Sequence, residues 1–341
     1  MALQWMESYL RDRSQVVMIN NDFSSSRDLS CGVPQGSVLG PILFSVYIAP
    51  MTDIIRKHGL QYHLYADDTQ IYLTFNPGDD LSAIKTAIES CVADIRKWMS
   101  SNYLKFNDDK LELSIFHSKH AVRPNITSID VGDESIPPAK SCRNIGVIYD
   151  ETLLFDKHVS SITKTSFWHL RNIWGIRRHL DNDSLLTLIH AFITSKLDYC
   201  NSLLTGLPKY LVKRLQSVQN AAARLVSGLK KYEHISPVLH QLHWLPVEKR
   251  IIFKILLMVF KCLHNIAPTY LCDLIVKYKP TRALRSGSKN LLVIPRSRTK
   301  GYGDRAFSVC GPSLWNSLPD DIKNQKTLEH FKRKLKTYLF N

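Results

Sequence analysis

The stretch that decides the fold is His63-Leu64-Tyr65-Ala66-Asp67-Asp68-Thr69-Gln70-Ile71-Tyr72. Apolar and aromatic residues flank a polar centre, which predicts two short strands joined by a tight turn. The turn carries two adjacent carboxylates, Asp67 and Asp68, and carboxylate oxygens are ligands that Mg²⁺ accepts. Taken alone the motif is short, and an ordinary acidic turn, whose Asp side chains supply turn hydrogen bonds, is the better interpretation.

A second motif lies upstream and changes this balance. It reads Cys31-Gly32-Val33-Pro34-Gln35-Gly36-Ser37-Val38-Leu39-Gly40-Pro41-Ile42-Leu43-Phe44. Glycine lets a backbone approach a ligand closely, and a helix that starts near Val38 would point its free N–H groups at this loop, with Pro41 tolerated in its first turn. The loop is either a site for a nucleotide or a nucleic-acid backbone or a plain strand-to-helix turn. Its position before the acidic hairpin favours the first alternative.

In this order the two motifs resemble the reverse transcriptase of LINE-type (non-LTR) retrotransposons, in which a Gly-Val-Pro-Gln-Gly-Ser loop precedes an aromatic-Ala-Asp-Asp hairpin. The resemblance covers nearly the whole chain. Residues 98–102 and 104–110 look like the family's next palm motif, and residues 143–147 look like its primer-grip hairpin. Residues 217–225 and 302–307 are similar to stretches of the family's region beyond the palm.

The resemblance implies an α+β fold in three parts. A partial polymerase palm, an antiparallel sheet with helices on one face, is expected over residues 1–156. A helical thumb-like region is expected over residues 157–275, and a basic C-terminal segment with a terminal helix over residues 276–341. The implied activity is RNA-directed DNA polymerisation by two-metal nucleotidyl transfer, with an RNA template, a DNA primer and dNTPs as partners and no membrane.

The resemblance also assigns roles to individual residues. Asp67 and Asp68 are the catalytic carboxylates and would hold Mg²⁺ or Mn²⁺, two ions if the site is complete. The nucleotide and template side is assigned to Pro34, Gln35, Gly36, Ser37, Tyr65, Ala66 and Lys110, and the primer grip to Asn144, Ile145 and Gly146. Lys110 precedes Leu111-Glu112 where the family usually has Thr-Glu, so a solvated surface lysine is the alternative for that position.

The chain departs from the family's pattern upstream of the Gly-Val-Pro-Gln-Gly loop. In the family a third aspartate, on a strand well before that loop, bridges both metals. Here the upstream candidates are Asp12, Asp22 and Asp28, and none has an apolar strand context. We therefore expect an N-terminally truncated domain without fingers, inactive in isolation unless another chain supplies the missing palm strand, with exposed apolar surface beside Tyr65 and Ile71. The alternative to a polymerase is an inactive nucleic-acid-binding remnant.

Composition favours a polyanionic partner. The 341 residues carry a net charge of +15, with a pI near 9.4, and such an excess of positive charge attracts nucleic acid through counterion release.

The most apolar run, residues 251–260, is too short to span a bilayer and contains Lys254, so it predicts a core helix. The N-terminus lacks a secretory signal pattern, which predicts an intracellular protein without deciding between nucleus and cytoplasm. Seven scattered cysteines without a Cys-x-x-Cys pair predict buried free thiols.

Hydrophobic spacing predicts the remaining elements. A helix over residues 3–10 and a strand over residues 15–20 precede the glycine-rich loop, and a capped helix of about five turns starts at Asp80. Two further apolar runs, over residues 185–197 and 211–225, predict helices. A terminal helix is expected over residues 328–340, with an apolar face made of Phe331, Leu335, Tyr338 and Leu339.

A one-sided basic segment precedes that terminal helix. Residues 277–300 contain no Asp or Glu and eight basic residues: Lys277, Lys279, Arg282, Arg285, Lys289, Arg296, Arg298 and Lys300. The nearby rings of Tyr278 and Tyr302 are suited to stack on bases, which favours a flexible segment that orders on RNA. A solvated basic linker is the alternative.

Overall fold

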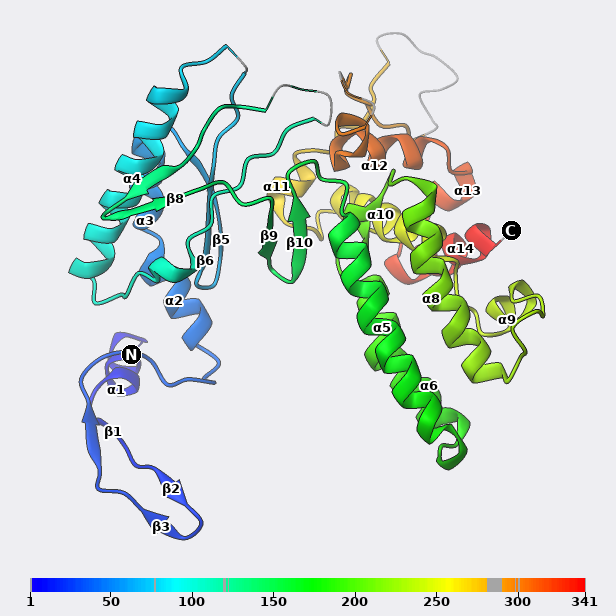
Figure 1. The fold of residues 1–341 in the computed structure, drawn as a ribbon, viewed down its shortest axis with the longest axis horizontal. Coiled ribbons are helices and arrows are strands. Elements are labelled where there is room, and N and C mark those ends of the chain that lie inside the picture. The colour runs from blue at the N-terminus through cyan, green and yellow to red at the C-terminus, as the bar shows by residue number, and fades with distance from the viewer. Residues whose placement is uncertain are drawn as a thin grey trace. The chain divides into compact units, whose positions relative to one another are not determined.

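The computed structural model describes residues 2–76, 78–118, 121, 123–280, 290–297, 299 and 301–340. The chain forms two compact units, whose elements are labelled in Figure 1. Unit 1 comprises Met1–Leu113 and Val122–Pro138, and unit 2 comprises Ser114–Ala121 and Ala139–Asn341. Helices and short antiparallel strands occur in both, which confirms the α+β class. The division into palm, thumb and basic segment remains a prediction.

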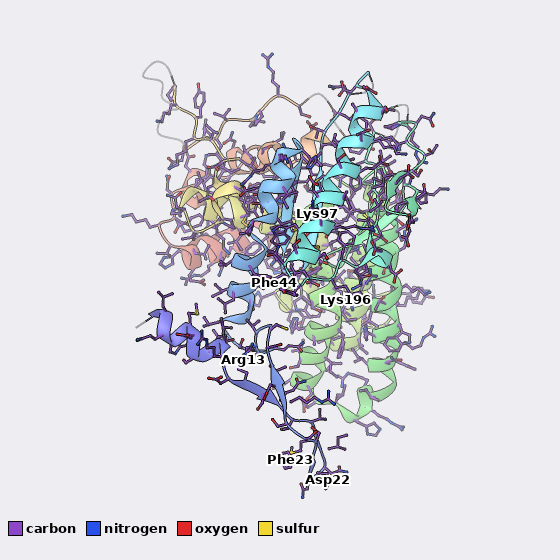
Figure 2. All side chains as sticks on the ribbon, turned by 90° about the vertical axis from the view of Figure 1, so that its left-hand side faces the viewer. Arg13, Asp22, Phe23, Phe44, Lys97 and Lys196 are labelled. Atoms are coloured by element: carbon purple, nitrogen blue, oxygen red, sulfur yellow. The ribbon has the colours of Figure 1, made fainter. Side chains whose placement is uncertain are left out.

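The N-terminal part of unit 1 is a helix followed by a long hairpin. Helix α1 (Ala2–Leu10) leads into four short strands: β1 (Arg13–Gln15), β2 (Met18–Ile19), β3 (Asp22–Phe23) and β4 (Arg27–Leu29). Strand β1 pairs with β4, and β2 pairs with β3. Figure 2 shows Asp22 and Phe23 at the tip of this hairpin and Arg13 farther back. The single strand predicted over residues 15–20 is wrong, because the amide of Val17 bonds to the hydroxyl of Ser24, 2.9 Å away, and interrupts the ladder.

The core of unit 1 lies between helices and the acidic hairpin. Its elements are α2 (Gly40–Ile48), α3 (Met51–Lys57), β5 (Gln61–Tyr65), β6 (Asp68–Tyr72) and α4 (Leu81–Ser101). One face of the β5–β6 hairpin packs on α3 and α4 around buried Met51, Ile55, Cys91 and Ile95. The predicted cap at Asp80 is confirmed, since its carboxylate accepts from the amide of Ser82 at 2.9 Å.

Three further elements complete unit 1: the 3₁₀ turn η1 (Asp108–Lys110), β7 (Ile129–Val131) and β8 (Glu134–Ile136). Strands β7 and β8 form a hairpin whose Ile129 and Val131 are buried against Val92 of α4. An ion pair of 2.8 Å between Lys85 and Asp130 also joins α4 to β7. Every sheet among the described residues has two strands, so a continuous palm sheet is not seen there.

After the segment Ser114–Ala121, unit 2 continues with a hairpin, β9 (Ser141–Asn144) and β10 (Val147–Asp150), and its other described elements are helices. The first helices are α5 (Asp156–Ile176), η2 (Arg177–His179), α6 (Asn182–Ile189), the π-helix η3 (His190–Thr194), α7 (Ser195–Asp198), η4 (Asn201–Leu204) and α8 (Lys209–Ser227). They are followed by α9 (Ser236–Gln241), α10 (Val247–Leu263), α11 (Thr269–Cys272), η6 (Gly303–Arg305), α12 (Phe307–Asn316), α13 (Asp320–Lys323) and α14 (Leu328–Phe340).

Two apolar clusters hold these helices together. In one, α5 packs along α8, and in the other, α10 packs against α12 and α14. The apolar run of residues 251–260 is a core helix, as predicted, with Ile251, Ile255 and Val259 buried. The terminal helix is confirmed over residues 328–340, with the exception that Tyr338 is 41% exposed and lies off the buried face.

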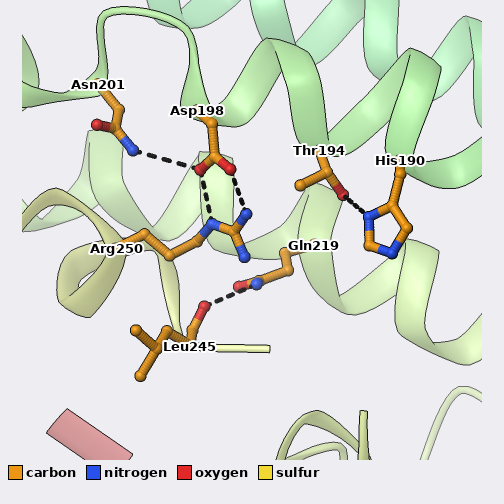
Figure 3. A network of polar contacts seen from close by, with 7 residues as sticks. All are labelled: His190, Thr194, Asp198, Asn201, Gln219, Leu245 and Arg250. Atoms are coloured by element: carbon orange, nitrogen blue, oxygen red, sulfur yellow. Dashed lines mark hydrogen bonds and ion pairs between the residues drawn. The ribbon is translucent and has the colours of Figure 1, made fainter. Parts of the chain in front are cut away.

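Polar contacts join α10 to α7 and α7 to η4, and a separate contact joins α8 to the segment before α10, as Figure 3 shows. The guanidinium of Arg250 donates through Nε to Asp198, 2.7 Å away, and Asn201 donates to the same carboxylate. The buried amide of Gln219 donates to the carbonyl of Leu245 at 2.8 Å. These contacts satisfy groups whose burial would otherwise be costly.

Arg305 fastens the later part of unit 2 to its beginning. Its guanidinium donates to the carbonyls of Leu153 (2.8 Å), Thr205 (2.9 Å) and Leu203 (3.1 Å) and lies over the ring of Phe155. Arg305 belongs to the stretch of residues 302–307 that resembles the family. In the structure this stretch holds distant parts of unit 2 together, because the Arg305 side chain bonds to residues that lie 100 to 152 positions earlier in the chain.

Asp150 organises the turn between β10 and α5. Its carboxylate accepts hydrogen bonds from Thr152 Oγ1 (2.7 Å) and from the amides of Thr152, Leu154 and Phe155. Burial alone would raise the pKa of Asp150, but these hydrogen bonds outweigh burial and lower the pKa from its ordinary value. The turn includes Leu153 and Phe155 at positive φ, conformations that side chains other than glycine rarely adopt.

The β9–β10 turn is also unusual. Ile145 and Gly146 have φ of 43° and 77°, as a two-residue hairpin turn requires. The hydroxyl of Tyr199 donates to the carbonyl of Ile145 at 2.7 Å. A Cβ atom on Gly146 would lie 3.2 Å from the Tyr199 ring. Tyr199 therefore holds the turn closed, and a side chain at position 146 would crowd its ring at a positive φ.

Two further predictions concern membrane-spanning helices and the state of the cysteines. Among the helices of the described residues, none combines the length and the apolar character needed to cross a bilayer. The seven cysteines are free thiols, as predicted, but the prediction that they are buried holds only for Cys91 and Cys262: Cys31 is exposed and the other four are partly exposed.

Replacing Asp150 with Asn is expected to lower the free energy of unfolding near pH 7, because an NH₂ group replaces one accepting oxygen and the charge is lost. The folded pKa lies below the ordinary value of 3.8, so the stabilisation by Asp150 is complete above that pH and is lost as the pH falls through the folded pKa. Urea unfolding of both chains should therefore show a difference that shrinks below pH 3.8. A difference that stays constant, or an equal effect of Asp22→Asn at the exposed hairpin tip, contradicts this account.

Replacing Gly146 with Ala is expected to destabilise the chain by about 1–2 kcal/mol, because the new Cβ meets the Tyr199 ring at a positive φ. Gly175→Ala, at an open position on α5, is the matched control and should stabilise by about 0.5 kcal/mol. Urea unfolding monitored by circular dichroism measures both. Equal stability of Gly146→Ala and the parent chain would show that Tyr199 does not confine the turn.

Candidate active site

The acidic turn has the geometry that the sequence predicts. Strands β5 and β6 are antiparallel, with Tyr65 opposite Asp68, so Ala66 and Asp67 form a two-residue turn. Ala66 has a φ of 53°, which such turns require and which is uncommon for a residue with a side chain. The hairpin is therefore confirmed, and its turn presents Asp67 and Asp68 next to one another.

The two faces of the hairpin differ in character. Tyr62, Leu64 and Ile71 are partly buried against the core of unit 1. Tyr65 lies on the opposite face and is 62% exposed, and on that face His63 stacks on Tyr72 with ring centroids 5.1 Å apart. Because Asp68 is opposite Tyr65, it shares the exposed face. Exposure beside Tyr65 is as expected, whereas the expectation for Ile71 is wrong, because Ile71 faces the core.

The glycine-rich loop is fixed by its neighbours in sequence and space. Ser37 Oγ accepts a hydrogen bond from Tyr9 Oη at 2.5 Å and another from the amide of Gly40 at 3.2 Å. Arg13 donates to the carbonyl of Gly32 at 2.7 Å. Helix α2 starts at Gly40, two residues later than predicted, and carries Pro41 in its first turn.

The same loop leaves Pro34, Gln35 and Gly36 exposed. Gly36 has a φ of 84°, a conformation that favours glycine. These residues are therefore accessible to a ligand, while Ser37 is engaged in holding the loop. Their roles toward nucleotide and template remain predictions.

Lys110 lies at the end of η1 and is exposed. Its turn is held by Arg96 of α4, which pairs with Asp108 and lies over the ring of Phe106. In the part of the chain that the structure describes, neither Lys110 nor the loop of residues 34–37 makes a hydrogen bond or ion pair with Asp67 or Asp68. The structure thus places these groups in the same unit without joining them by polar contacts.

The primer-grip prediction falls on the β9–β10 turn, which belongs to unit 2. Asn144 ends β9, and Ile145 and Gly146 form the turn that Tyr199 holds. Sequence reasoning missed Tyr199, since it lies 54 positions beyond Ile145 in the chain. The hairpin is confirmed, and its role toward a primer remains a prediction.

The donors at the acidic turn suit a hard cation. Mg²⁺ is usually held by one or two carboxylates together with water and substrate phosphates, and exposed Asp67 and Asp68 match that donor set. Within the described residues, no group of three or more His, Cys, Asp or Glu side chains is gathered in a metal-binding arrangement. The upstream candidates Asp12, Asp22 and Asp28 are all exposed, on the α1–β1 connection and on the hairpin that follows it.

The basic segment is described in part. Lys277, Lys279 and Arg296 are exposed, and Lys277 bridges to Leu292. The other five predicted residues, Arg282, Arg285, Lys289, Arg298 and Lys300, lie outside the described residues. Binding of nucleic acid by this segment remains a prediction.

Comparisons with known proteins bear on the family. A family model described as "Reverse transcriptase (RNA-dependent DNA polymerase)" matches residues 1–149. A probable RNA-directed DNA polymerase from transposon X-element of Drosophila melanogaster is 26% identical over 228 residues, which are 65% of this chain and 24% of that protein. The corresponding protein from transposon BS of the same organism is 24% identical over 257 residues, 72% of this chain and 28% of that protein.

A third relative is the RNA-directed DNA polymerase from mobile element jockey of Drosophila melanogaster, 24% identical over 236 residues, 67% of this chain and 25% of that protein. The chain thus spans about a quarter of the length of these relatives. No solved structure matches. These matches confirm the resemblance seen in the motifs: the chain is related to the reverse transcriptases of non-LTR retrotransposons, and its residues 1–149 match that polymerase family.

Proposed function

We propose that this chain acts as an RNA-directed DNA polymerase domain of a LINE-type retrotransposon, with Asp67 and Asp68 as ligands of its catalytic metal. The observation that carries the proposal is the pair of adjacent, exposed carboxylates at the turn of a hairpin whose other face is anchored in an apolar core. The family match over residues 1–149 supports it.

The packing of the hairpin explains how the carboxylates are positioned. Leu64 and Ile71 are packed on α3 and α4, and the turn contains only two residues, so the tip has little freedom to move relative to the core. A metal site gains affinity when its ligands are held in place before the metal binds. The exposed face then leaves room for a nucleotide and a nucleic-acid end.

Two divalent ions about 3.5–4 Å apart would supply activation of a primer hydroxyl and charge stabilisation on the triphosphate. Asp67 and Asp68 contribute the negative charge that localises such ions. Lys110, exposed on η1, would contact the triphosphate or donate a proton to the leaving pyrophosphate. Gln35 and Gly36 would contact template and incoming nucleotide.

The proposed partners are an RNA template, a DNA primer and dNTPs, and the net charge of +15 is suited to such polyanions. In unit 2, Asn144, Ile145 and Gly146 would position the primer end.

Primer extension tests the proposal. Residues 1–341 are incubated with an RNA template, a DNA primer, dNTPs and Mg²⁺ or Mn²⁺, and the same assay is run on Asp67→Asn and Asp68→Asn. Each substitution keeps the side-chain size and removes the charge, so extension should fall by about a hundredfold or more. Asp22→Asn, at the exposed tip of the other hairpin, is the matched control and should extend like the parent chain.

Two outcomes contradict polymerase activity at this turn. Extension that persists in both Asn variants would place the metal ligands elsewhere. Absence of extension by the parent chain, together with salt-dependent binding of the template–primer duplex, would support the inactive nucleic-acid-binding remnant instead.

A further inference from the structure

A group of aromatic rings lies on the surface of unit 2, on α5 and η3. Trp168 and His169 belong to α5, and Phe192 belongs to the π-helix η3. The His169 ring stacks on Phe192 with centroids 4.9 Å apart and an interplanar angle of 25°, and its other neighbour is Trp168, at 4.8 Å edge to face. Trp168 is 59% and Phe192 40% exposed. We call these three rings the aromatic platform.

The helices that carry the aromatic platform pack on the core of unit 2. On the opposite side of α5, Val159, Ile162, Leu170 and Ile173 are buried in the core of unit 2. In η3 the neighbouring Ile193 is buried, while Phe192 stays outside. A π-helical turn is rare, and where one occurs it is often at a functional site. The core thus holds Ile193, while the Phe192 ring stacks on His169 and remains 40% exposed.

The charge around the platform is positive. Residues 157–180 contain no Asp or Glu. Lys164, Trp168 and Arg171 are spaced by four and three positions and therefore share one face of α5. Lys164 and Arg171 are exposed and make no hydrogen bond or ion pair with another described residue. Lys196 of α7 adds a third positive charge, close enough to His169 to act on its pKa.

Three of the nearest carboxylates along the chain are engaged elsewhere, whereas Asp183 in the first turn of α6 is exposed. Asp156 pairs with Arg214 at 3.3 Å, and Asp181 caps α6 through the amide of Ser184. Asp198 is held by Arg250. Partial burial, and then the charge of Lys196, lower the pKa of His169, so its ring is neutral near pH 7 and suited to stacking. The platform therefore combines neutral aromatic faces with unpaired cations.

We propose that the aromatic platform binds single-stranded nucleic acid, with bases stacking on Trp168 and Phe192. Lys164, Arg171 and Lys196 contact the phosphates. Exposed rings interleaved with basic residues are the combination that binds single strands through base stacking and charge. An unpaired base offers its ring faces to a side chain, whereas a duplex keeps those faces in its own stack. The platform is in unit 2 and uses neither Asp67 nor Asp68, so this activity goes beyond the proposed polymerisation.

Fluorescence anisotropy of the full chain tests the aromatic part of the proposal. The probes are a labelled single-stranded RNA of mixed sequence and the same strand annealed to its complement. The double variant Trp168→Ala/Phe192→Ala should bind the single strand about tenfold or more weakly, and its duplex affinity should change less than about twofold. Tyr232→Ala, which removes a 91% exposed ring elsewhere in unit 2, is the matched control and should bind like the parent chain.

A conservative variant distinguishes a loss of binding caused by lost stacking from one caused by misfolding. Trp168→Phe/Phe192→Tyr keeps both aromatic faces and should retain most of the single-strand affinity. Loss of binding in this variant as complete as in the alanine variant would contradict a stacking role.

The role of the basic residues is tested by the salt dependence of single-strand binding. Lys164→Gln and Arg171→Gln should each make the dependence of log affinity on log salt shallower by about 0.7 for single strands, because one phosphate contact is lost. The alanine variant of the rings should leave this slope unchanged. Asp67→Asn/Asp68→Asn should bind the single strand normally, so failure of polymerisation does not affect the test.

Three results would overturn the proposal. The first is absence of single-strand binding by the parent chain. The second is single-strand affinity of the alanine variant equal to that of the parent chain. The third is an equal loss of single-strand and duplex affinity in that variant, which would identify a surface that recognises backbone charge alone.

Discussion

The two-residue period of the β5–β6 hairpin is the constraint on which the candidate active site depends. Successive side chains of a strand point to opposite faces, so burial of Leu64 and Ile71 forces Tyr65 and Asp68 outward. A shift of the register by one residue would bury the carboxylate and expose the apolar side chains. The contacts of the hairpin with α3 and α4 therefore fix the carboxylates at an exposed turn, and the proposed chemistry follows from the packing.

Unit 2 is organised by hydrogen bonds to main-chain groups around turns that have strained φ angles. Arg305 donates to three carbonyls, Asp150 accepts from three amides, and Tyr199 closes the turn at Ile145. Such contacts satisfy main-chain groups that the helices leave without partners. Part of what resembles the family beyond the palm thus has a structural explanation, because Arg305 belongs to that stretch and stabilises the junction before α5.

The sequence predicted what local patterns determine. The acidic hairpin, the cap at Asp80 and the terminal helix follow from alternation, capping chemistry and helical spacing, and all are confirmed. Long-range contacts were not predictable, since Tyr199 and Arg305 act on main-chain atoms far away in the chain. The interruption at Val17 depends on a side-chain hydrogen bond that competes with the ladder, and the alternation of apolar residues does not reveal it.

Binding of Mn²⁺ measured by electron paramagnetic resonance, with a dNTP present to supply phosphate oxygens, tests most directly whether the hairpin turn is a metal site. The account predicts that the full chain binds the ion and that Asp67→Asn/Asp68→Asn loses most of that affinity, while Asp22→Asn does not. Equal Mn²⁺ binding by the parent chain and the double variant would contradict the assignment, because the carboxylates at the turn would then contribute nothing to the site.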